Sequence, residues 1–270
     1  MPELTPGALV LVLAGLVIAG FVAGVLNSVV GSGSLVTFPA LIAIGVPPLP
    51  ATLTSSVGLT LSNFSGPWGY RAMLAAQGRR LLMLLPVAGA GGLTGSLLLT
   101  ALPSTVFATL APLLILLAVV LVVVQPLLQR AISARRSTTE AVPPLPGPVP
   151  RGVMIALMFL ASVYGGYFVA AQGVFMFGIL GAFIGGDLRY VNALKNALAS
   201  LINLLSATVY VITSFDRIVW PFVAAVAAGA GIGGLLGVRI ARRVPGAALR
   251  WLIVAIGVAG LLALLLRPSA

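Results

Sequence analysis

The sequence contains no cysteine and no histidine among its 270 residues. Without thiols or imidazoles the chain forms no disulfide, and the usual zinc and haem ligand sets and histidine general bases are excluded. Acidic residues are scarce too, because only Glu3, Glu140, Asp187 and Asp216 occur. All four fall in predicted termini or loops. We therefore expect no paired carboxylates inside the protein, no metal, no other cofactor and no enzymatic activity.

Charged residues of any kind make up only 7% of the chain, whereas hydrophobic residues make up 60% and the mean hydropathy is +1.18. A soluble domain carries about 25% charged residues. Several apolar runs reach ~20 residues, the length of helix that crosses ~30 Å of hydrocarbon. Strand-like alternation is missing, so the pattern predicts an all-α polytopic membrane protein rather than a β-barrel.

The apolar runs are arranged in two similar halves. We predict an N-terminal repeat over 1–127, a Pro- and Arg-rich linker over 128–150 and a C-terminal repeat over 151–270. Each half contains one apolar piece that is too short for an untilted span and indicates a broken or half-length helix. The predicted segments are 8–26, 35–45, 51–70, 81–100 and 104–125, then 152–170, 174–185, 190–212, 218–238 and 247–266.

The two halves also align residue by residue, although weakly. A shift of 140 residues places Gly33 on Gly173, Gly45 on Gly185, Asn63 on Asn203 and Tyr70 on Tyr210. The matching order of long and short segments strengthens these few identities. Five segments per half is an odd number, so the second repeat would be inverted relative to the first, as in many secondary transporters.

The distribution of arginine predicts the orientation of the chain. The net charge is +11, but the arginines cluster beside apolar runs, which indicates membrane topology rather than nucleic-acid binding. With both termini outside, only Arg217 and Arg267 lie outside. Six arginines and those of the linker lie inside: Arg79, Arg80, Arg189, Arg239, Arg242 and Arg243 together with Arg130, Arg135 and Arg136. This positive-inside bias favours counting the short pieces as crossings.

Two matched stretches interrupt the apolar runs, Gly31-Ser-Gly-Ser34 and Ala170-Ala-Gln-Gly173. Helix breaks at membrane depth are tolerated where the freed backbone faces protein or a wet cavity. A half-helix that starts there points its N–H groups and positive dipole end at the membrane centre, where an anion would be stabilised. The alternative is that these glycines only permit tight turns and close packing.

Lys195 is the only lysine of the chain, and it lies in the apolar segment 190–212. An ammonium inside a bilayer costs several kcal/mol, so an intramembrane lysine indicates function by default. The alternative is a side chain that reaches a lipid headgroup from near the helix start. Because Asp187 and Arg189 already mark the interface two turns earlier, we favour a counter-charge for an anion.

Polar side chains accompany both breaks. Asn192, Asn196 and Asn203 lie on one helical stripe, and Thr52, Ser56 and Asn63 lie on the matched stripe of the first half, with Thr54 and Ser55 nearby. Such residues also supply ordinary interhelical hydrogen bonds. Tyr164, Tyr167 and Gln172 precede the second break and could donate to a ligand, although the tyrosines would also suit a membrane interface.

Several stretches resemble the TauE/SafE family of sulfite-exporter-like membrane permeases. Gly20-Phe-Val-Ala-Gly24, leading to Gly31-Ser-Gly33 and Pro39, is similar to its first motif, and Ala51-Thr-Leu-Thr-Ser55 to its second. Tyr164-Gly-Gly-Tyr-Phe168 followed by Gly173, then Asn192-Ala-Leu-Lys-Asn196, resembles its second-half signature. The chain departs from the pattern at Ser34 and at Val169-Ala-Ala-Gln172, where the family carries more glycine.

The resemblance implies outward transport of small sulfur-containing anions such as sulfite, sulfonates or sulfoacetate across the cytoplasmic membrane of a bacterium. Together with the residue patterns it predicts a central anion site between the two halves. An anion channel and a non-transporting assembly protein remain alternatives, and an enzyme would have only a Ser55–Lys195 dyad available. A homo-oligomer is left open. The predicted substrate-binding residues are Asn27, Gly31, Ser32, Gly33, Ser34, Thr54, Ser55, Tyr164, Tyr167, Gln172, Gly173, Asn192, Lys195 and Asn196.

Overall fold

The computed structural model describes residues 5–29, 33–63, 74–75, 78–134, 148–184, 188–241 and 246–266. These ranges contain α-helices and one short 3-10 helix, η1 (Phe215–Arg217), and no strand. The helices of the first half are α1 (Pro6–Val29), α2 (Ser34–Ala43), α3 (Pro48–Asn63), α6 (Gly78–Ala101) and α7 (Ser104–Ala134). Those of the second half are α8 (Pro148–Tyr167), α9 (Gln172–Phe183), α10 (Leu188–Thr213), α11 (Trp220–Ala241) and α12 (Gly246–Leu265).

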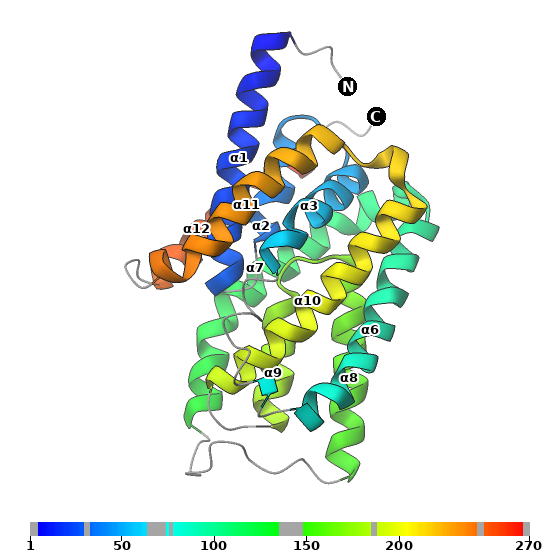
Figure 1. The fold of residues 1–270 in the computed structure, drawn as a ribbon, viewed down its shortest axis with the longest axis vertical. Helices are drawn as coiled ribbons and strands as arrows, with labels where there is room; N and C mark the ends of the chain where they lie inside the picture. The colour runs from blue at the N-terminus through cyan, green and yellow to red at the C-terminus, as the bar shows by residue number, and fades with distance from the viewer. Residues whose placement is uncertain are drawn as a thin grey trace.

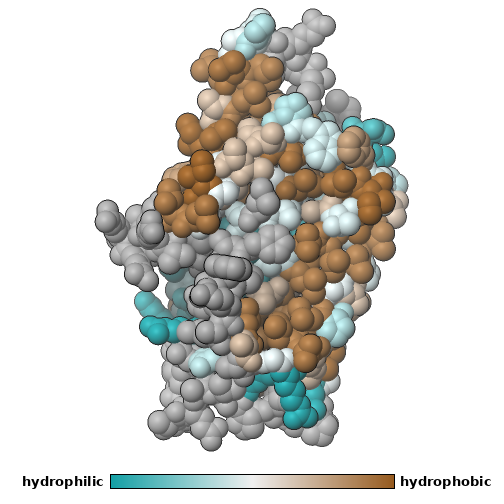
Figure 2. Space-filling model, in the orientation of Figure 1, coloured by the Kyte–Doolittle hydropathy of each residue, from teal (hydrophilic) through white to brown (hydrophobic). Residues whose placement is uncertain are grey.

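Within the described ranges, the helices confirm the predicted membrane class. Five of them are long and apolar enough to cross a bilayer: Pro6–Asn27, Gly78–Ala101, Ser104–Ala131, Arg189–Thr213 and Trp220–Gly237. Their outer faces expose large apolar side chains, such as Leu11, Leu113 and Leu235, and hydrophobic residues cover much of the described surface in Figure 2. Such a surface suits lipid rather than water.

The two short apolar pieces form short helices, as the sequence predicts. α2 and α9 stop after ten and 12 residues, and each lies beside the longer helix that follows it, α3 and α10. α7 continues to Ala134 and α8 begins at Pro148, so helix enters the predicted linker range from both sides. Residues 64–73, which include the rest of the predicted span 51–70, lie outside the described residues.

Helices of the two halves pack against each other in matched pairs. α1 packs against α11, and α8 packs against α6. In the same way α3 contacts α11 while α10 contacts α6, and α2 contacts α12 while α9 contacts α7. Figure 1 shows α1 beginning at the upper end of the molecule and α6 and α8 beginning at the lower end.

Close backbone approach holds these pairs together. A β-carbon at Gly229 would collide with the carbonyl oxygen of Val17 in α1, and one at Gly91 would collide with that of Phe159 in α8. One turn further along, Gly233 lies against Phe21 in the first of these helix pairs, and Gly95 lies against Val163 in the second. Small residues permit such approach between membrane helices, where dispersion contacts drive association.

The second predicted break is real, but it lies slightly earlier than its glycine. α8 ends at Tyr167 and α9 begins at Gln172, so Gly173 belongs to the first turn of α9. The link between them reverses at Ala171, which adopts a left-handed conformation with φ of 60°. At the first break, Gly33 precedes α2 with an ordinary helical φ of −60°, while Gly31 and Ser32 lie outside the described residues.

Candidate functional site

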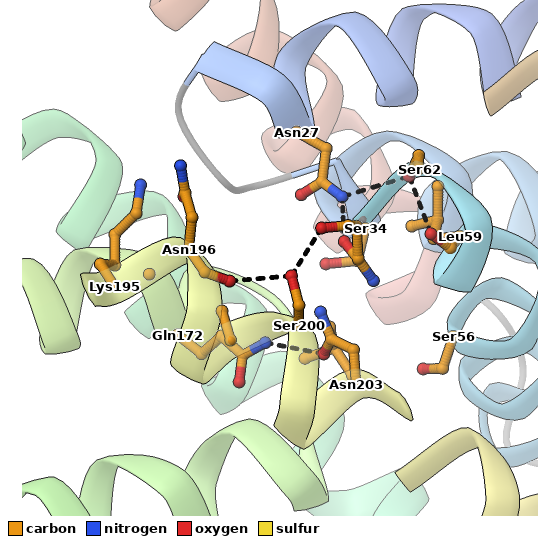
Figure 3. A pocket seen from close by; sticks show the side chains of 14 residues that line it. Asn27, Ser34, Ser56, Leu59, Ser62, Gln172, Lys195, Asn196, Ser200 and Asn203 are labelled. Carbon is orange, nitrogen blue, oxygen red and sulfur yellow. Dashed lines mark hydrogen bonds between the residues drawn. The ribbon is translucent and has the colours of Figure 1, made fainter. Parts of the chain in front are cut away.

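A small polar cavity lies where the starts of α2 and α9 meet α3 and α10 (Figure 3). Its volume, measured for the centre of a water-sized sphere, is about 30 Å³, whereas a single water needs about 10–15 Å³ on that measure. The cavity therefore admits only a small ligand. The residues that line it are Asn27, Ser34, Ser56, Leu59, Ser62, Asn63, Val169, Gln172, Gly173, Lys195, Asn196, Ala199, Ser200 and Asn203.

Lys195 supplies the only charge among these lining residues. Its side chain is only 3% exposed, so it does not reach the surface of the protein. No hydrogen bond or ion pair joins its ammonium to another residue in the part of the chain that the structure describes. A buried charge without a partner is costly, so an anion in the cavity would relieve that cost.

A frame of hydrogen bonds fixes much of the cavity wall. The Asn27 amide donates to the side chain of Asn63 and, at 3.3 Å, to the hydroxyl of Ser62. On the opposite half, the Gln172 amide donates to the Asn203 oxygen at 2.7 Å. These amides are held in place by protein partners and shape the site.

One hydrogen bond of this frame joins the halves directly. The Ser200 hydroxyl is 2.5 Å from the backbone carbonyl of Asn63 and 2.8 Å from that of Asn196. α3 and α10 are therefore tied together at the floor of the cavity by a side chain that reaches across the boundary between the halves.

Three further polar side chains belong to the cavity wall. The hydroxyls of Ser34 and Ser56 and the amide of Asn196 have no hydrogen-bond partner within the described ranges, although Ser34 and Ser56 are buried. Figure 3 shows Lys195 and Asn196 side by side on one side of the cavity and Ser56 on the other. The ammonium and these donors come from both halves of the chain.

The cavity contains six of the predicted site residues: Asn27, Ser34, Gln172, Gly173, Lys195 and Asn196. Gly33 does not line it but caps α2, and a β-carbon at this position would collide with Ala23 and crowd Asn27. The predicted stripes also contribute, because Ser56 and Asn63 line one wall and Asn203 lines another. Asn192 lies on the same helix as Lys195 but is not among the lining residues.

Two other predicted residues are occupied elsewhere. Thr54 accepts a hydrogen bond from the backbone N–H of Val219 at 3.1 Å. Ser55 shares a hydrogen bond with Thr37 of α2 at 2.5 Å. Because the Ser55 hydroxyl is paired with Thr37 and Lys195 has no hydrogen-bonded partner within the described ranges, the two do not form the dyad that an enzyme would need.

The two tyrosines pack beside the break rather than in the cavity. The Tyr164 hydroxyl donates to the carbonyl of Ala170 at 2.9 Å, and its ring contacts Phe175 edge-on. Tyr167 is buried against Phe107. Tyr164 therefore braces the link that positions Gln172, which is a supporting role.

Sequence reasoning did not single out Ser62 and Ser200, although both line the cavity. The available signal was spacing, since Ser200 follows Asn196 by one helical turn and precedes Asn203 on the same face. Within the described ranges no group of histidine, cysteine or acidic side chains could hold a metal. The described lining residues offer a ligand one ammonium and several neutral hydrogen-bonding groups.

Comparisons with known proteins found a matching family and a similar protein. A family model described as "Sulfite exporter TauE/SafE" matches residues 16–264. The chain is also similar to "Probable membrane transporter protein ORF9" of Sinorhizobium sp, with 30% identity over 104 residues. That match covers 38% of this chain and 40% of the relative, so it spans less than half of that protein's length. No solved structure matches the chain.

Proposed function

The chain belongs to the TauE/SafE family of membrane transporters, and from this premise we propose that it is a secondary transporter of small sulfur-containing anions. Sulfite, sulfonates and sulfoacetate are the proposed substrates, and the proposed direction is outward across a bacterial cytoplasmic membrane. The observation that carries the proposal is the buried ammonium of Lys195, which has no partner among the described residues and lies beside a small polar cavity.

Each free polar group has a role in this proposal. Lys195 is the counter-charge of the anion, and charge-assisted hydrogen bonds of this kind are the stronger ones. Asn196, Ser34 and Ser56 donate to the remaining anionic oxygens. Gln172 and Asn27 hold the walls through their bonds to Asn203 and Asn63. The first turns of α2 and α9 add backbone N–H groups and positive dipole ends.

Alternating access would come from the two halves as inverted repeats that rock against each other. The matched helix pairs support this arrangement, because each contact has a counterpart with the halves exchanged. The proposed orientation places both termini outside. It is supported by the positions of Arg79, Arg80 and Arg151, which lie near the starts of α6 and α8 at the end opposite to the start of α1 (Figure 1).

Such a site offers few groups that could carry a coupled proton. No carboxylate lines the cavity, so a coupled proton would travel on the substrate or on Lys195. We expect Asp187→Asn and Asp216→Asn to retain any pH-gradient dependence of transport in proteoliposomes. Loss of that dependence in either variant would contradict this assignment.

The test replaces the ammonium by an apolar chain of similar length, Lys195→Met. Removing one partner of a buried charge pair costs about 2–5 kcal/mol, so anion uptake or efflux should fall on the order of 100-fold. The control is Arg217→Gln, which removes a positive charge from the exposed η1 turn. Unchanged transport by Lys195→Met at normal expression refutes the site, and voltage-driven currents without saturation would identify a channel instead.

A further inference from the structure

We propose that the cavity selects its ligand by charge number, admitting singly charged anions and rejecting doubly charged anions of the same shape. This inference rests on the proposed function and narrows its substrates to singly charged anions. Hydrogensulfite and sulfonates with one charge would be ligands, and sulfate would not. Of the substrates proposed above, sulfoacetate and doubly ionised sulfite would then be excluded because each carries two charges.

The first argument is the charge count of the wall. Lys195 is the only charged side chain among the residues that line the cavity. Asp216 and Arg217 lie in the 3-10 helix η1, outside that lining. Among described residues, the site therefore offers a single positive charge, without the arginine fork that commonly recognises doubly charged oxyanions.

The second argument is burial. Lys195 is nearly inaccessible, and few waters fit beside it. In such an environment one negative charge is neutralised by the ammonium. A second finds no counter-charge among the described lining residues and keeps its desolvation cost. Neutral donors lower that cost but do not supply the missing charge.

The third argument combines the limited supply of neutral donors with the apolar part of the cavity wall. The amides of Asn27 and Gln172 already bond to Asn63 and Asn203. Leu59, Val169 and Ala199 give the remaining wall an apolar part. This part suits the carbon substituent of a sulfonate better than a fourth charged oxygen.

The experiment compares three molecules of similar shape and different charge. Binding of dimethyl sulfone, methanesulfonate and sulfate to the purified full chain is measured by calorimetry and thermal shift. We expect methanesulfonate to bind at least about 100-fold more tightly than sulfate, and dimethyl sulfone to bind more weakly than methanesulfonate. Sulfate binding as tightly as methanesulfonate overturns charge selection but leaves an anion site in place. If neither anion nor sulfite binds, the proposed function itself fails.

A second variant tests whether the wall charge sets the preference. Asn196→Lys adds an ammonium beside Lys195, and Asn196→Gln is the matched neutral control. The ratio of sulfate affinity to methanesulfonate affinity should rise at least about tenfold in the lysine variant and stay unchanged in the glutamine variant. A folded Asn196→Lys protein with an unchanged ratio contradicts the inference. If this variant does not fold, the series on the unmodified chain decides.

Sulfite provides an independent measurement because pH changes its charge. Expressed per total sulfite, the apparent affinity should fall by about tenfold per pH unit once hydrogensulfite becomes the minor species. Methanesulfonate keeps its charge, so its affinity in the same buffers corrects for titration of the protein. A sulfite-to-methanesulfonate ratio that does not change with pH overturns the inference.

Discussion

α3 and α10 present the same positions to the cavity but different chemistry. Ser56, Leu59 and Asn63 face it from α3, and Asn196, Ala199 and Asn203 face it from α10 with the same spacing. The helices differ most at the residues just before Ser56 and Asn196. Ser55 is bonded to Thr37 of α2, whereas Lys195 lines the cavity. The two helices therefore share the spacing of these lining residues, while Lys195 gives α10 alone a charge at the cavity.

The difference teaches that shape and chemistry are divided between the halves. Both supply a short helix, a polar helix face and glycine contacts to the opposite half. Among the described lining residues Lys195 of the second half is the one cation, so an anion would be held mainly by α10 and touched by hydroxyls of the first half. The substitutions below test this division.

The largest effect is expected from making α10 resemble α3. Lys195→Ser should reduce anion transport on the order of 100-fold, since the counter-charge is lost. The reference is Ser55→Ala, which removes the bond to Thr37 outside the cavity and should retain transport within a few-fold. Flux into proteoliposomes measures both. Equal losses in the two variants would mean that the helices contribute alike.

Next come the matched glycine contacts. Gly229→Ala and Gly91→Ala each force a β-carbon into a carbonyl of the facing helix, and we expect each to destabilise the protein by about 1–3 kcal/mol. Gly231→Ala is the control because no atom of a neighbour lies within 4 Å of its β-carbon position. Thermal unfolding in detergent measures the loss. A strong effect at only one of the matched glycines would weaken the inverted-repeat proposal.

The two asparagines at the ends of the polar faces should differ. Asn203→Ala leaves the Gln172 amide without its partner, and the Gln172 oxygen already lacks one within the described ranges, so we expect a cost of about 1–3 kcal/mol. Asn63→Ala should cost less, because Asn27 keeps its bond to Ser62. Thermal unfolding should show that the Gln172→Ala/Asn203→Ala double variant loses less stability than the sum of the losses of the two single variants.

The smallest effect concerns the link before α9. Ala171 is left-handed, a conformation that costs an L-residue about 1–2 kcal/mol and glycine almost nothing. Because glycine also makes the unfolded chain more flexible, Ala171→Gly should raise stability by less than about 1 kcal/mol. Ala171→Val should lower the melting temperature, since a branched side chain tolerates this φ poorly. A stabilised valine variant would show that the link adopts another conformation.

Segment lengths alone predicted much of the fold. The short pieces before Gly45 and Gly185 became α2 and α9 because prolines and glycines stop the apolar runs there. The helical spacing of Asn196, Asn203 and Ser56 also predicted which faces of α10 and α3 meet at the cavity, since spacing along a helix determines the side on which a side chain lies. These predictions depend on local geometry, which the sequence carries directly.

Pairing across helices could not be predicted in the same way. Ser55 aligns with Lys195 in the repeat, yet its hydroxyl is bonded to Thr37, a residue that no local pattern connects with it. The roles of Tyr164 and Tyr167 depend on how the chain reverses at Ala171, and an alanine gives no sign of a left-handed residue. Tertiary contacts decided these positions, not propensity.

The buried ammonium of Lys195 also has an electrical consequence. A fixed unit charge that moves across part of a membrane does work against the voltage, about 2.3 kcal/mol for each 100 mV it crosses fully. Under the proposed mechanism, a singly charged anion cancels that charge while it is bound. The empty protein would then be the form whose reorientation responds to membrane potential, and the loaded protein would cross almost indifferent to it.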